Sequence, residues 1–570
     1  MSAAPEFITA TLARLPGLTA ALTQCGEKTL AEYSRDFFPE PTASAIEPLD
    51  DFLDAAERIA APLLGQDVAC ALREQLERSP SALTANHHGL DTLHQSVHST
   101  IAFALPALLG RSDGPRVLPV LACSGVPLGS VTFPRGMVLA KKPDLLDDAN
   151  PAKVRIPFFP HALRTCAAGA APALNKERFN TALKYCERLM RESMLTHSQY
   201  GFLRDFITQE CLRKDVLAQP TFSDQAVLLN SRLWPRLFAP EVRGQAPALA
   251  YLDMERVVAA VLARDLRRDS LVAALLFDPG VRESLLHALD GATGCWSGER
   301  LERLCTMPEG RTIQHGDLRG TGTMFFWAVD AGGRHLPMRI EDGSAKPGAP
   351  VLAARTMDGG RIEVALAAEP ILHALAEGRI SPSLFTSYTT LAMARGVRCW
   401  GGVYQAAYLR EMQRGVAQAL RMSGGDDAAS RVSEAPCGCF LAGLITVFSE
   451  FPDKEPRGEL REVPSAKPGN EPRDEKPGDE PRDEKPRDEP RAGYIAPACA
   501  PDIAAAGGLT AAQIEQISHL TMAQACTAGL LQTYEEITSA SERKKGWYGE
   551  MCLYMLEECG EGLPRVEQMD

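Results

Sequence analysis

Short apolar runs alternate with longer segments of helical periodicity in the middle of the chain. Residues 82–85 and 116–123 are two such runs, and between them the apolar positions from 87 to about 109 recur with helical spacing. Runs of this length are typical of strands that are buried on both faces of a parallel sheet. The order strand, helix, strand therefore predicts a βαβ unit, with a ligand crevice at the carboxyl ends of its strands.

The same pattern predicts further elements along the chain. They are an extended pair at 130–139, two helices at 174–215, a core strand at Ala226–Ser231, helices at 253–290, a hairpin of 323–329 with 335–340, and helices near 384–396 and 403–422. The fold class that we expect is α/β, with a Rossmann-like parallel sheet as the core and additional helical regions around it.

Four segments differ in character. Residues 1–80 have helical periodicity with little indication of strands, 81–450 form the expected α/β body, and 501–570 return to helical periodicity. Within 451–500, a nine-residue stretch rich in proline and charge, Glu471–Asp479, recurs almost unchanged. Such a composition buries almost nothing apolar, so we expect a disordered, extended linker. The C-terminal helical segment is expected to pack back onto the body.

Composition narrows the classes of function. The chain has 570 residues, 45% of them hydrophobic and 23% charged, with a net charge of −13. These values are ordinary for a soluble protein and argue against general binding of nucleic acid or of an anionic membrane. The first residues do not resemble a secretory signal, no apolar stretch is long enough to span a bilayer, and the fifteen cysteines form no Cys-x-x-Cys pair. We expect a cytoplasmic protein that acts on a small molecule; whether it forms a homodimer is left open.

Histidine is concentrated directly after the first predicted strand. Four of the eleven histidines, His87, His88, His94 and His98, lie within twelve residues. If a helix begins at His87 after an N-cap at Asn86, then His87, Asp91, His94 and His98 fall within an arc of roughly 60°. The histidine row would then border the buried face of that helix.

A histidine pair at a strand-to-helix turn suits phosphate chemistry. Amide groups at a helix N-terminus attract phosphate, and an imidazole can donate to an oxygen on which charge develops. We therefore expect nucleotidyl transfer or ATP-driven ligation, with ATP or another nucleotide bound at the turn. The expected catalytic residues are His87, His88, Asp91 and His94, where Asp91 orients or deprotonates a neighbour such as His94. The expected cofactor contacts are Thr84, Asn86 and Gly89, and the expected substrate contacts are Asn230, Ser231 and Tyr404.

Other interpretations of the same residues stay open. His87, Asp91, His94 and His98 have a spacing that suits zinc or iron ligands, which predicts a metal-dependent enzyme instead. Alternatively, His94 and His98 are polar residues at a domain boundary whose hydrogen bonds are satisfied there. A third interpretation is a noncatalytic scaffold that uses the charged linker and the C-terminal helix to hold a partner.

The order of several short motifs resembles the bacillithiol synthase family, bacterial enzymes that add cysteine to an acceptor. The matching pieces are Thr84–Thr92, Pro119–Ala122, Leu228–Ser231, Phe325–Trp327 and Trp400–Leu409. The resemblance implies a doubly wound, nucleotidyltransferase-like (HUP) fold and a biosynthetic ligase or transferase. Such an enzyme would form a C–N bond between an amine- or thiol-bearing, amino-acid-like substrate and an acceptor. The chain departs from the family at Ser124–Pro127, where the family has an acidic cluster, and in its linker and last helix.

Overall fold

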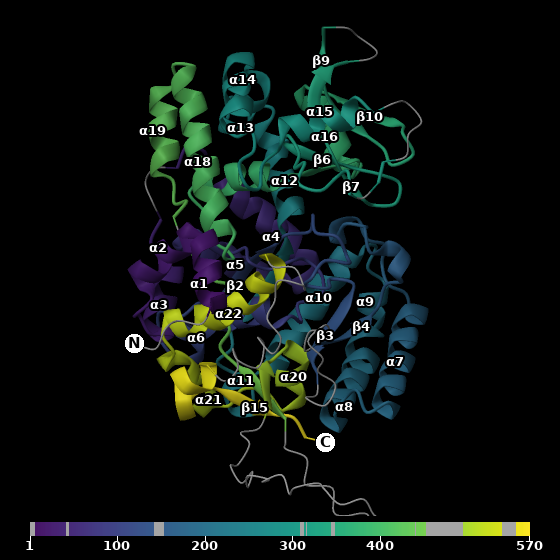
Figure 1. Ribbon diagram of the computed structural model, residues 1–570, viewed down its shortest axis with the longest axis vertical. Coiled ribbons are helices and arrows are strands. Elements are labelled where there is room, and N and C mark those ends of the chain that lie inside the picture. Colours follow the sequence, from purple (N-terminus) through teal and green to yellow (C-terminus); the bar gives the residue numbers. More distant parts are fainter. Residues whose placement is uncertain are drawn as a thin grey trace, which may run out of the picture.

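The computed structural model describes most of the chain. The described residues are 6–41, 45–141, 153–307, 313–314, 316–343, 348–438, 440–451, 494–537 and 554–569. The predicted linker repeat lies outside these residues, as does part of the predicted C-terminal helical segment. Figure 1 shows the arrangement of the helices and strands.

A parallel sheet forms the centre of the molecule. In the described part of the chain, four strands lie in the order β12 (Arg398–Trp400), β1 (Ser81–Leu83), β2 (Val117–Ala122) and β5 (Ala248–Asp253). All three pairings between them are parallel. Every residue of β1 and β2 is buried, because helices cover both faces of the sheet. The predicted α/β class and the predicted βαβ unit are thereby confirmed.

Side chains alternate between the two faces of this sheet. Leu83 and Val120 belong to one hydrophobic core, which they share with α6 (His94–Leu108). Ala82 and Leu121 belong to a second core on the opposite face, which they share with α4 (Asp50–Leu64) and α12 (Met254–Asp265). The sheet is therefore the middle of three layers.

The strand order places a crevice between β1 and β12. From β1 the chain continues to β2 and then to β5 in one direction across the sheet, whereas β12 is added on the other side of β1. The direction of the strand order thus reverses between β1 and β12. In parallel sheets, ligands bind at such a reversal, outside the carboxyl ends of the strands. The segments that follow β1 and β12 are therefore the first place to look for a site.

Smaller sheets surround this core. Their strands are β3 (Gly136–Ala140) with β4 (Lys153–Pro157); β11 (Ile380–Pro382), β6 (Phe326–Val329) and β7 (His335–Pro337); β8 (Arg339–Asp342), β9 (Pro350–Arg355) and β10 (Arg361–Ala365); and β13 (Phe448–Phe451), β14 (Tyr494–Pro497) and β15 (Arg565–Glu567). The predicted hairpin is confirmed by the antiparallel pairing of β6 with β7. In Figure 1, β6, β7, β9 and β10 lie together at the top of the molecule.

Helices make up most of the remaining described structure. In the sequence, the helices before β1 include α1 (Glu6–Arg14), α2 (Pro16–Cys25), α3 (Leu30–Tyr33) and α5 (Gln66–Arg78). The middle of the chain adds α7 (Lys176–Arg191), α8 (His197–Phe206), α9 (Lys214–Leu217), α10 (Phe222–Leu233), α11 (Pro240–Arg243), α13 (Leu271–Phe277), α14 (Pro279–Ala288), α15 (Gly298–Cys305), α16 (Ala368–Ala376), α17 (Leu384–Tyr388), α18 (Gln405–Met422) and α19 (Asp426–Glu434). The last described helices are α20 (Ala500–Ala505), α21 (Ala511–His519) and α22 (Met522–Ile537). No described helix is long and apolar enough to cross a membrane.

The two ends of the chain pack together. A bridge joins Thr29 to Thr521, and the Tyr33 hydroxyl donates to the Leu441 carbonyl at 2.8 Å. In Figure 1 the purple N-terminal helices lie beside yellow α22. The described residues of the C-terminal segment contribute to the same hydrophobic core as α6, so this segment does pack back onto the body.

Three predicted elements were wrong. The extended pair expected at 130–139 is a single strand, β3, and its partner β4 lies farther along the chain. The helix after β1 begins at His94 and not at His87, because Asn86 does not cap it: the Asn86 amide donates to Asp91 and Thr100 instead. Residues Ala226–Ser231 lie inside helix α10, whose first turn is capped by Thr221. Every residue of that apolar run except Ser231 is buried, and for such a run hydrophobic periodicity does not separate a helix from a strand.

Candidate functional site

A cavity of about 260 Å³ lies at the reversal of strand order. Thr84 and His87, which follow β1, line it together with Cys123, which follows β2. Gly402 and Tyr404, which follow β12, line the opposite side. We call this the switch cavity. It coincides with the crevice that the strand order predicts, and it contains three of the residues expected from the sequence: Thr84, His87 and Tyr404.

His87 is the histidine that reaches this cavity. Its side chain is half-buried, and its Nδ1 lies 2.9 Å from the Thr132 hydroxyl, which is itself 2.9 Å from the Ser130 hydroxyl. No described residue forms a hydrogen bond with Nε2. Burial lowers the pKa of His87 to about 4, so the ring is neutral at pH 7. When Thr132 donates to Nδ1, the proton is on Nε2, which is then a donor for a ligand.

Two long helices begin beside the switch cavity. Gln95 and Ser96 from the first turn of α6 line it, and so does Gln405 from the first turn of α18. Neither helix has a side-chain hydrogen bond from its N-cap residue. None of the described residues that line the cavity is Lys, Arg, Asp or Glu. At α18 the partial positive charge of the helix N-terminus is therefore not offset by a carboxylate in the lining, which favours an anionic group, whereas at α6 the Asp91 carboxylate behind the lining already accepts from the Ser96 hydroxyl.

Gln405 holds this side of the cavity in place. Its Oε1 accepts from the Thr84 hydroxyl at 2.9 Å and from the Tyr388 hydroxyl at 2.7 Å, while its Nε2 donates to the Cys399 carbonyl at 3.1 Å. All three groups are buried. The network joins the segments after β1 and β12 and so fixes the width of the crevice.

A second, larger cavity of about 460 Å³ lies beyond the carboxyl ends of β2 and β5. Asp253, Glu255, Asp224 and Arg256 line it, and His335 from β7 joins them. We call it the acidic cavity. Residues of α16 and β11, among them Leu375 and Ile380, form a more apolar wall.

Asp253 and Glu255 fasten the segment that separates the two cavities. Glu255 accepts from the backbone amides of Ser124 at 2.7 Å and Gly125 at 3.0 Å. Asp253 accepts from the Ser124 hydroxyl at 2.7 Å and caps α12 by accepting from the Arg256 amide. Burial raises the pKa of Glu255, and the neighbouring Asp253 charge raises it further. The carboxylates thus determine the position of Ser124 and Gly125.

Cys123 is the thiol at this edge, and it is not activated. It lines the switch cavity, and its Sγ donates to Glu255 Oε1 at 3.1 Å. Burial, followed by the nearby Glu255 charge, raises the pKa of Cys123 well above that of an ordinary thiol. The resting protein therefore carries a protonated thiol here, not a thiolate nucleophile.

The structure separates the two adjacent histidines that the sequence pairs. His88 is fully buried, and its ring stacks on Tyr251 with the centroids 5.7 Å apart. Its Nε2 lies 2.9 Å from the Ser223 hydroxyl, which donates to Asp253. The expectation that both imidazoles project into one cavity is therefore right for His87 and wrong for His88, because the chain after β1 turns the second ring into the core.

Asp91 and His94 do not form the expected pair. The Asp91 carboxylate accepts from the Ser96 hydroxyl and from the Asn86 amide, and burial raises the pKa of Asp91 to about 6. His94 is buried, and neither of its ring nitrogens has a hydrogen-bond partner among the described residues, so the alternative of a satisfied polar residue is wrong for His94. Because helix α6 starts at His94, Asp91 lies in the preceding loop and its carboxylate bonds locally.

The expected contacts at Gly89, Asn230 and Ser231 have structural partners instead. Gly89 has a φ of +137°, and a Cβ there would lie 2.8 Å from Pro134 Cβ, so the close approach that it permits is to Pro134. The Asn230 side chain donates to the Gly89 carbonyl and accepts from the Asp91 amide, and the Ser231 hydroxyl donates to the Leu228 carbonyl. Asn230 positions the loop, and neither Asn230 nor Ser231 lines the two cavities.

The alternative metal set is not assembled. Both ring nitrogens of His98 are used by the backbone: Nε2 bonds to the Ala498 carbonyl at 2.8 Å, and Nδ1 accepts from the Thr446 amide. Within the described ranges, no three His, Cys, Asp or Glu side chains are grouped as a metal site requires. His87, Asp91, His94 and His98 therefore do not form a ligand set. For His98, the interpretation as a polar residue whose hydrogen bonds are satisfied within the protein is confirmed.

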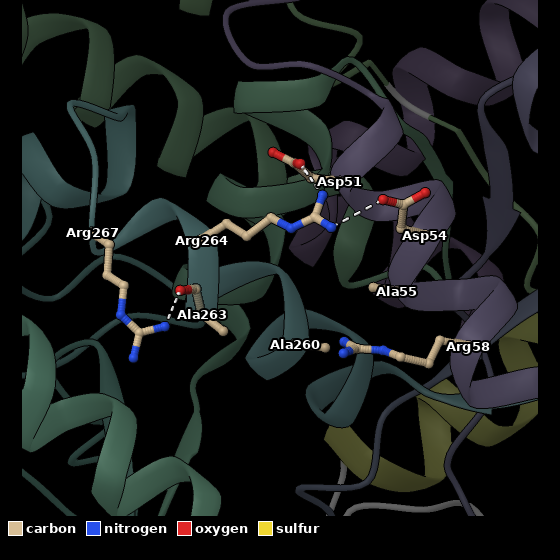
Figure 2. Close-up of a pocket in the computed structure, with 8 residues that line it drawn as sticks. All are labelled: Asp51, Asp54, Ala55, Arg58, Ala260, Ala263, Arg264 and Arg267. Carbon is tan, nitrogen blue, oxygen red and sulfur yellow. Dashed lines mark hydrogen bonds and ion pairs between the residues drawn. The ribbon is translucent and has the colours of Figure 1, made fainter.

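A third hollow, of about 380 Å³, lies between α4 and α12 (Figure 2). Arg264 bonds to both Asp51 and Asp54, and Arg267 forms an ion pair with Glu369. Figure 2 shows the Arg58 guanidinium pointing toward Ala260 across a floor of small side chains. Most of the charge in this hollow is already paired.

Sequence reasoning missed the acidic groups. Asp253 ends a short apolar run, Ala248–Asp253, and Glu255 follows two residues later; the same kind of run predicted β2. Gln405 and His335 had no comparable indication, because their roles depend on contacts with residues far away in the sequence.

Comparison with known proteins finds no matching family model, no matching curated protein and no matching solved structure. The function must therefore be argued from the two cavities.

Proposed function

We propose that the chain is a ligase or transferase that joins two small molecules and binds the anionic group of one of them in the switch cavity. The observation that carries this proposal is the position of His87. Its half-buried, neutral ring is anchored through Nδ1, and its Nε2 has no described partner at a cavity where strand order reverses. A ring held in this way can donate to an oxygen of a phosphate or carboxylate.

The lining suits a phosphate group better than a whole nucleotide. The first turn of α18 provides a helix N-terminus, at which phosphates bind. The volume of about 260 Å³ lies slightly below the range of roughly 300–1,000 Å³ that is usual for ligand sites. ATP or another nucleotide would place one phosphate beside His87 and the first turn of α18. With ATP, transfer of a phosphoryl or nucleotidyl group to a substrate carboxylate would release ADP or pyrophosphate. Attack of an amine on the resulting mixed anhydride would then form the C–N bond and release phosphate or the nucleoside monophosphate.

The reaction class follows the family that the motifs resemble. In that family an amine- or thiol-bearing substrate is joined to an acceptor through a C–N bond. In this chain His87 would orient the anionic group, and Gln405 would fix the width of the switch cavity through its hydrogen bonds. Cys123, which is protonated, would be a polar residue of the lining and not a nucleophile. Bacillithiol-synthase-like ligation is thus the reaction that we propose.

Thermal unfolding with added ligand tests the proposal directly. Inorganic phosphate and ATP are expected to raise Tm of the full chain, since ligands that bind only the folded state stabilise it. His87→Ala should remove most of this shift, whereas His87→Gln, which keeps a donor, should retain part of it. His287→Ala alters an exposed histidine on α14 and serves as the matched control.

Turnover is the second readout. Mixtures of ATP, one amino acid and one sugar acceptor are screened by mass spectrometry for a condensed product, which His87→Ala should lose while His287→Ala keeps it. If neither phosphate nor ATP shifts Tm, or if His87→Ala responds like the parent chain, the proposal is wrong.

A further inference from the structure

The acidic cavity has a charge balance opposite to that of the switch cavity. Three carboxylates, from Asp224, Asp253 and Glu255, line it against one guanidinium, from Arg256. The carboxylates are buried, whereas the Arg256 side chain is 47% exposed and bonds to Asp224. Buried carboxylates without enough cations carry a large desolvation cost, which a bound cation would offset.

The Ser124 hydroxyl lies between two of these carboxylates, whose oxygens also accept from the backbone amides of Ser124, Gly125 and Arg256, the Ser223 hydroxyl and the Cys123 thiol. The single hydroxyl proton of Ser124 lies between two acceptors, Asp253 Oδ1 at 2.7 Å and Glu255 Oε2 at 3.0 Å. A Cβ built on Gly169, which also lines the cavity, would lie 2.7 Å from Ser124 Oγ and 3.4 Å from Asp253 Oδ2. Glycine at this position therefore avoids a steric clash with the Ser124 hydroxyl and leaves space beside the Asp253 carboxylate.

An acceptor in the wall has no described partner. The ring of His335 stacks on Trp327, and its buried Nδ1 forms no hydrogen bond with any residue that the structure describes. It lies on the same side as Glu255, because an added Cβ on Gly125 would be 3.1 Å from Glu255 Oε1 and 3.5 Å from His335 Nδ1. Burial lowers the pKa of His335 to about 4, so at pH 7 the ring is neutral and its unprotonated nitrogen accepts a hydrogen bond.

We infer that the acidic cavity binds the ammonium group of a small aliphatic amine. An ammonium supplies three donors and one positive charge, which match the carboxylates and the His335 acceptor. Leu375 and Ile380, which also line the cavity, provide apolar surface for an aliphatic chain. A volume of about 460 Å³ admits a molecule of metabolite size.

This inference deepens the proposed function, on which it rests for the role of the amine as the attacking substrate. Before the attack the bound ammonium would give up one proton, for which the carboxylates of the acidic cavity are the acceptors. It assigns the amine to one side of Cys123–Gly125 and the anionic group to the other. The carboxylates also favour an amine over a thiol, because a neutral thiol would supply no charge to them.

The experiment measures binding of n-butylamine to the full chain by thermal unfolding and by calorimetry at pH 7. Butylammonium chloride should raise Tm above the value in equimolar NaCl, and 1-butanol, which has the same chain without charge, should not. Asp224→Asn should raise the Kd for n-butylamine about tenfold, as expected for the loss of one charged partner.

A blocking variant provides the control. Ala259→Phe projects into the acidic cavity from α12 and should abolish the amine response, whereas Ala263→Phe, one turn later on the same helix, lines only the third hollow and should keep it. If Ala259→Phe does not fold, Asp224→Asn decides the question in its place.

The result also separates this inference from the proposed function. His87→Ala should lose the phosphate response and keep the amine response. Equal shifts with 1-butanol and n-butylamine, or an amine response that survives both Ala259→Phe and Asp224→Asn, would overturn the inference while leaving the switch cavity unaffected.

Discussion

The Tyr251 hydroxyl donates to the backbone carbonyl of His87 at 2.7 Å. Tyr251 belongs to β5 at one edge of the parallel sheet, whereas His87 follows β1, with β2 between the two strands. The bond therefore ties the loop that carries His87 to a distant strand, and it fixes where the imidazole enters the switch cavity.

Removing this hydroxyl should loosen the loop without disturbing the sheet. Tyr251→Phe leaves the His87 carbonyl without this donor, and we expect it to lower the free energy of unfolding by about 1 kcal/mol. The Tm shift produced by phosphate should fall as well, since the imidazole is less well placed. Urea denaturation and thermal unfolding measure the two effects; unchanged phosphate binding would show that the bond does not position His87.

A buried ion pair should contribute to the stability of the protein. Arg395 is 1% exposed and donates twice to Asp265, at 2.6 and 2.9 Å. Arg395→Met leaves the Asp265 carboxylate buried without this ion pair. We therefore expect the free energy of unfolding, measured by urea denaturation, to fall by about 3 kcal/mol. Arg267→Met, which breaks the exposed ion pair with Glu369, should change stability little.

His98 should make stability depend on acid pH. Burial lowers its pKa to about 3, and its Nδ1 accepts from the Thr446 amide. The unfolded chain binds a proton near pH 6.5 but the folded chain only near 3, so stability is lost as pH falls through this window. His98→Gln removes that titration. The difference in unfolding free energy between parent and variant should shrink from pH 7 to pH 4; a constant difference would contradict this.

Cys123 should resist alkylation although it lines a cavity. Its thiol donates to Glu255 and is held protonated, whereas Cys70 is exposed on α5. Treatment with iodoacetamide at pH 7.5 followed by peptide mass spectrometry should label Cys70 at least tenfold faster, because the thiolate is the reactive form. Comparable labelling of both residues would indicate an activated thiol and would revise its role.

Gly89 should not accept a side chain. Its φ of +137° and the proximity of Pro134 both penalise alanine, and we expect Gly89→Ala to cost about 1–3 kcal/mol. Gly244→Ala is the matched control, since its φ of −69° is helical and an added Cβ there meets no atom within 4 Å. Chemical denaturation of both variants gives the comparison.

The sequence by itself determined where several strands and helices of this protein lie along the chain. The apolar runs predicted β1 and β2, the helical periodicity predicted the N-terminal helices, and the position of His87 after a buried strand predicted its place at the sheet edge. These features depend on neighbouring residues, whose spacing along the chain is directly visible. The hairpin of β6 and β7 was predictable for the same reason.

Tertiary structure alone decided which of these groups meet. The burial of His88, the helical state of Ala226–Ser231 and the contact of Glu255 with Ser124 all depend on packing between segments that are distant in the sequence. An apolar run can be buried in a helix or in a strand with equal hydrophobic gain, and a polar side chain bonds to whichever partner the packing provides. The two cavities therefore follow from the way these distant segments pack beside the sheet and not from any single motif.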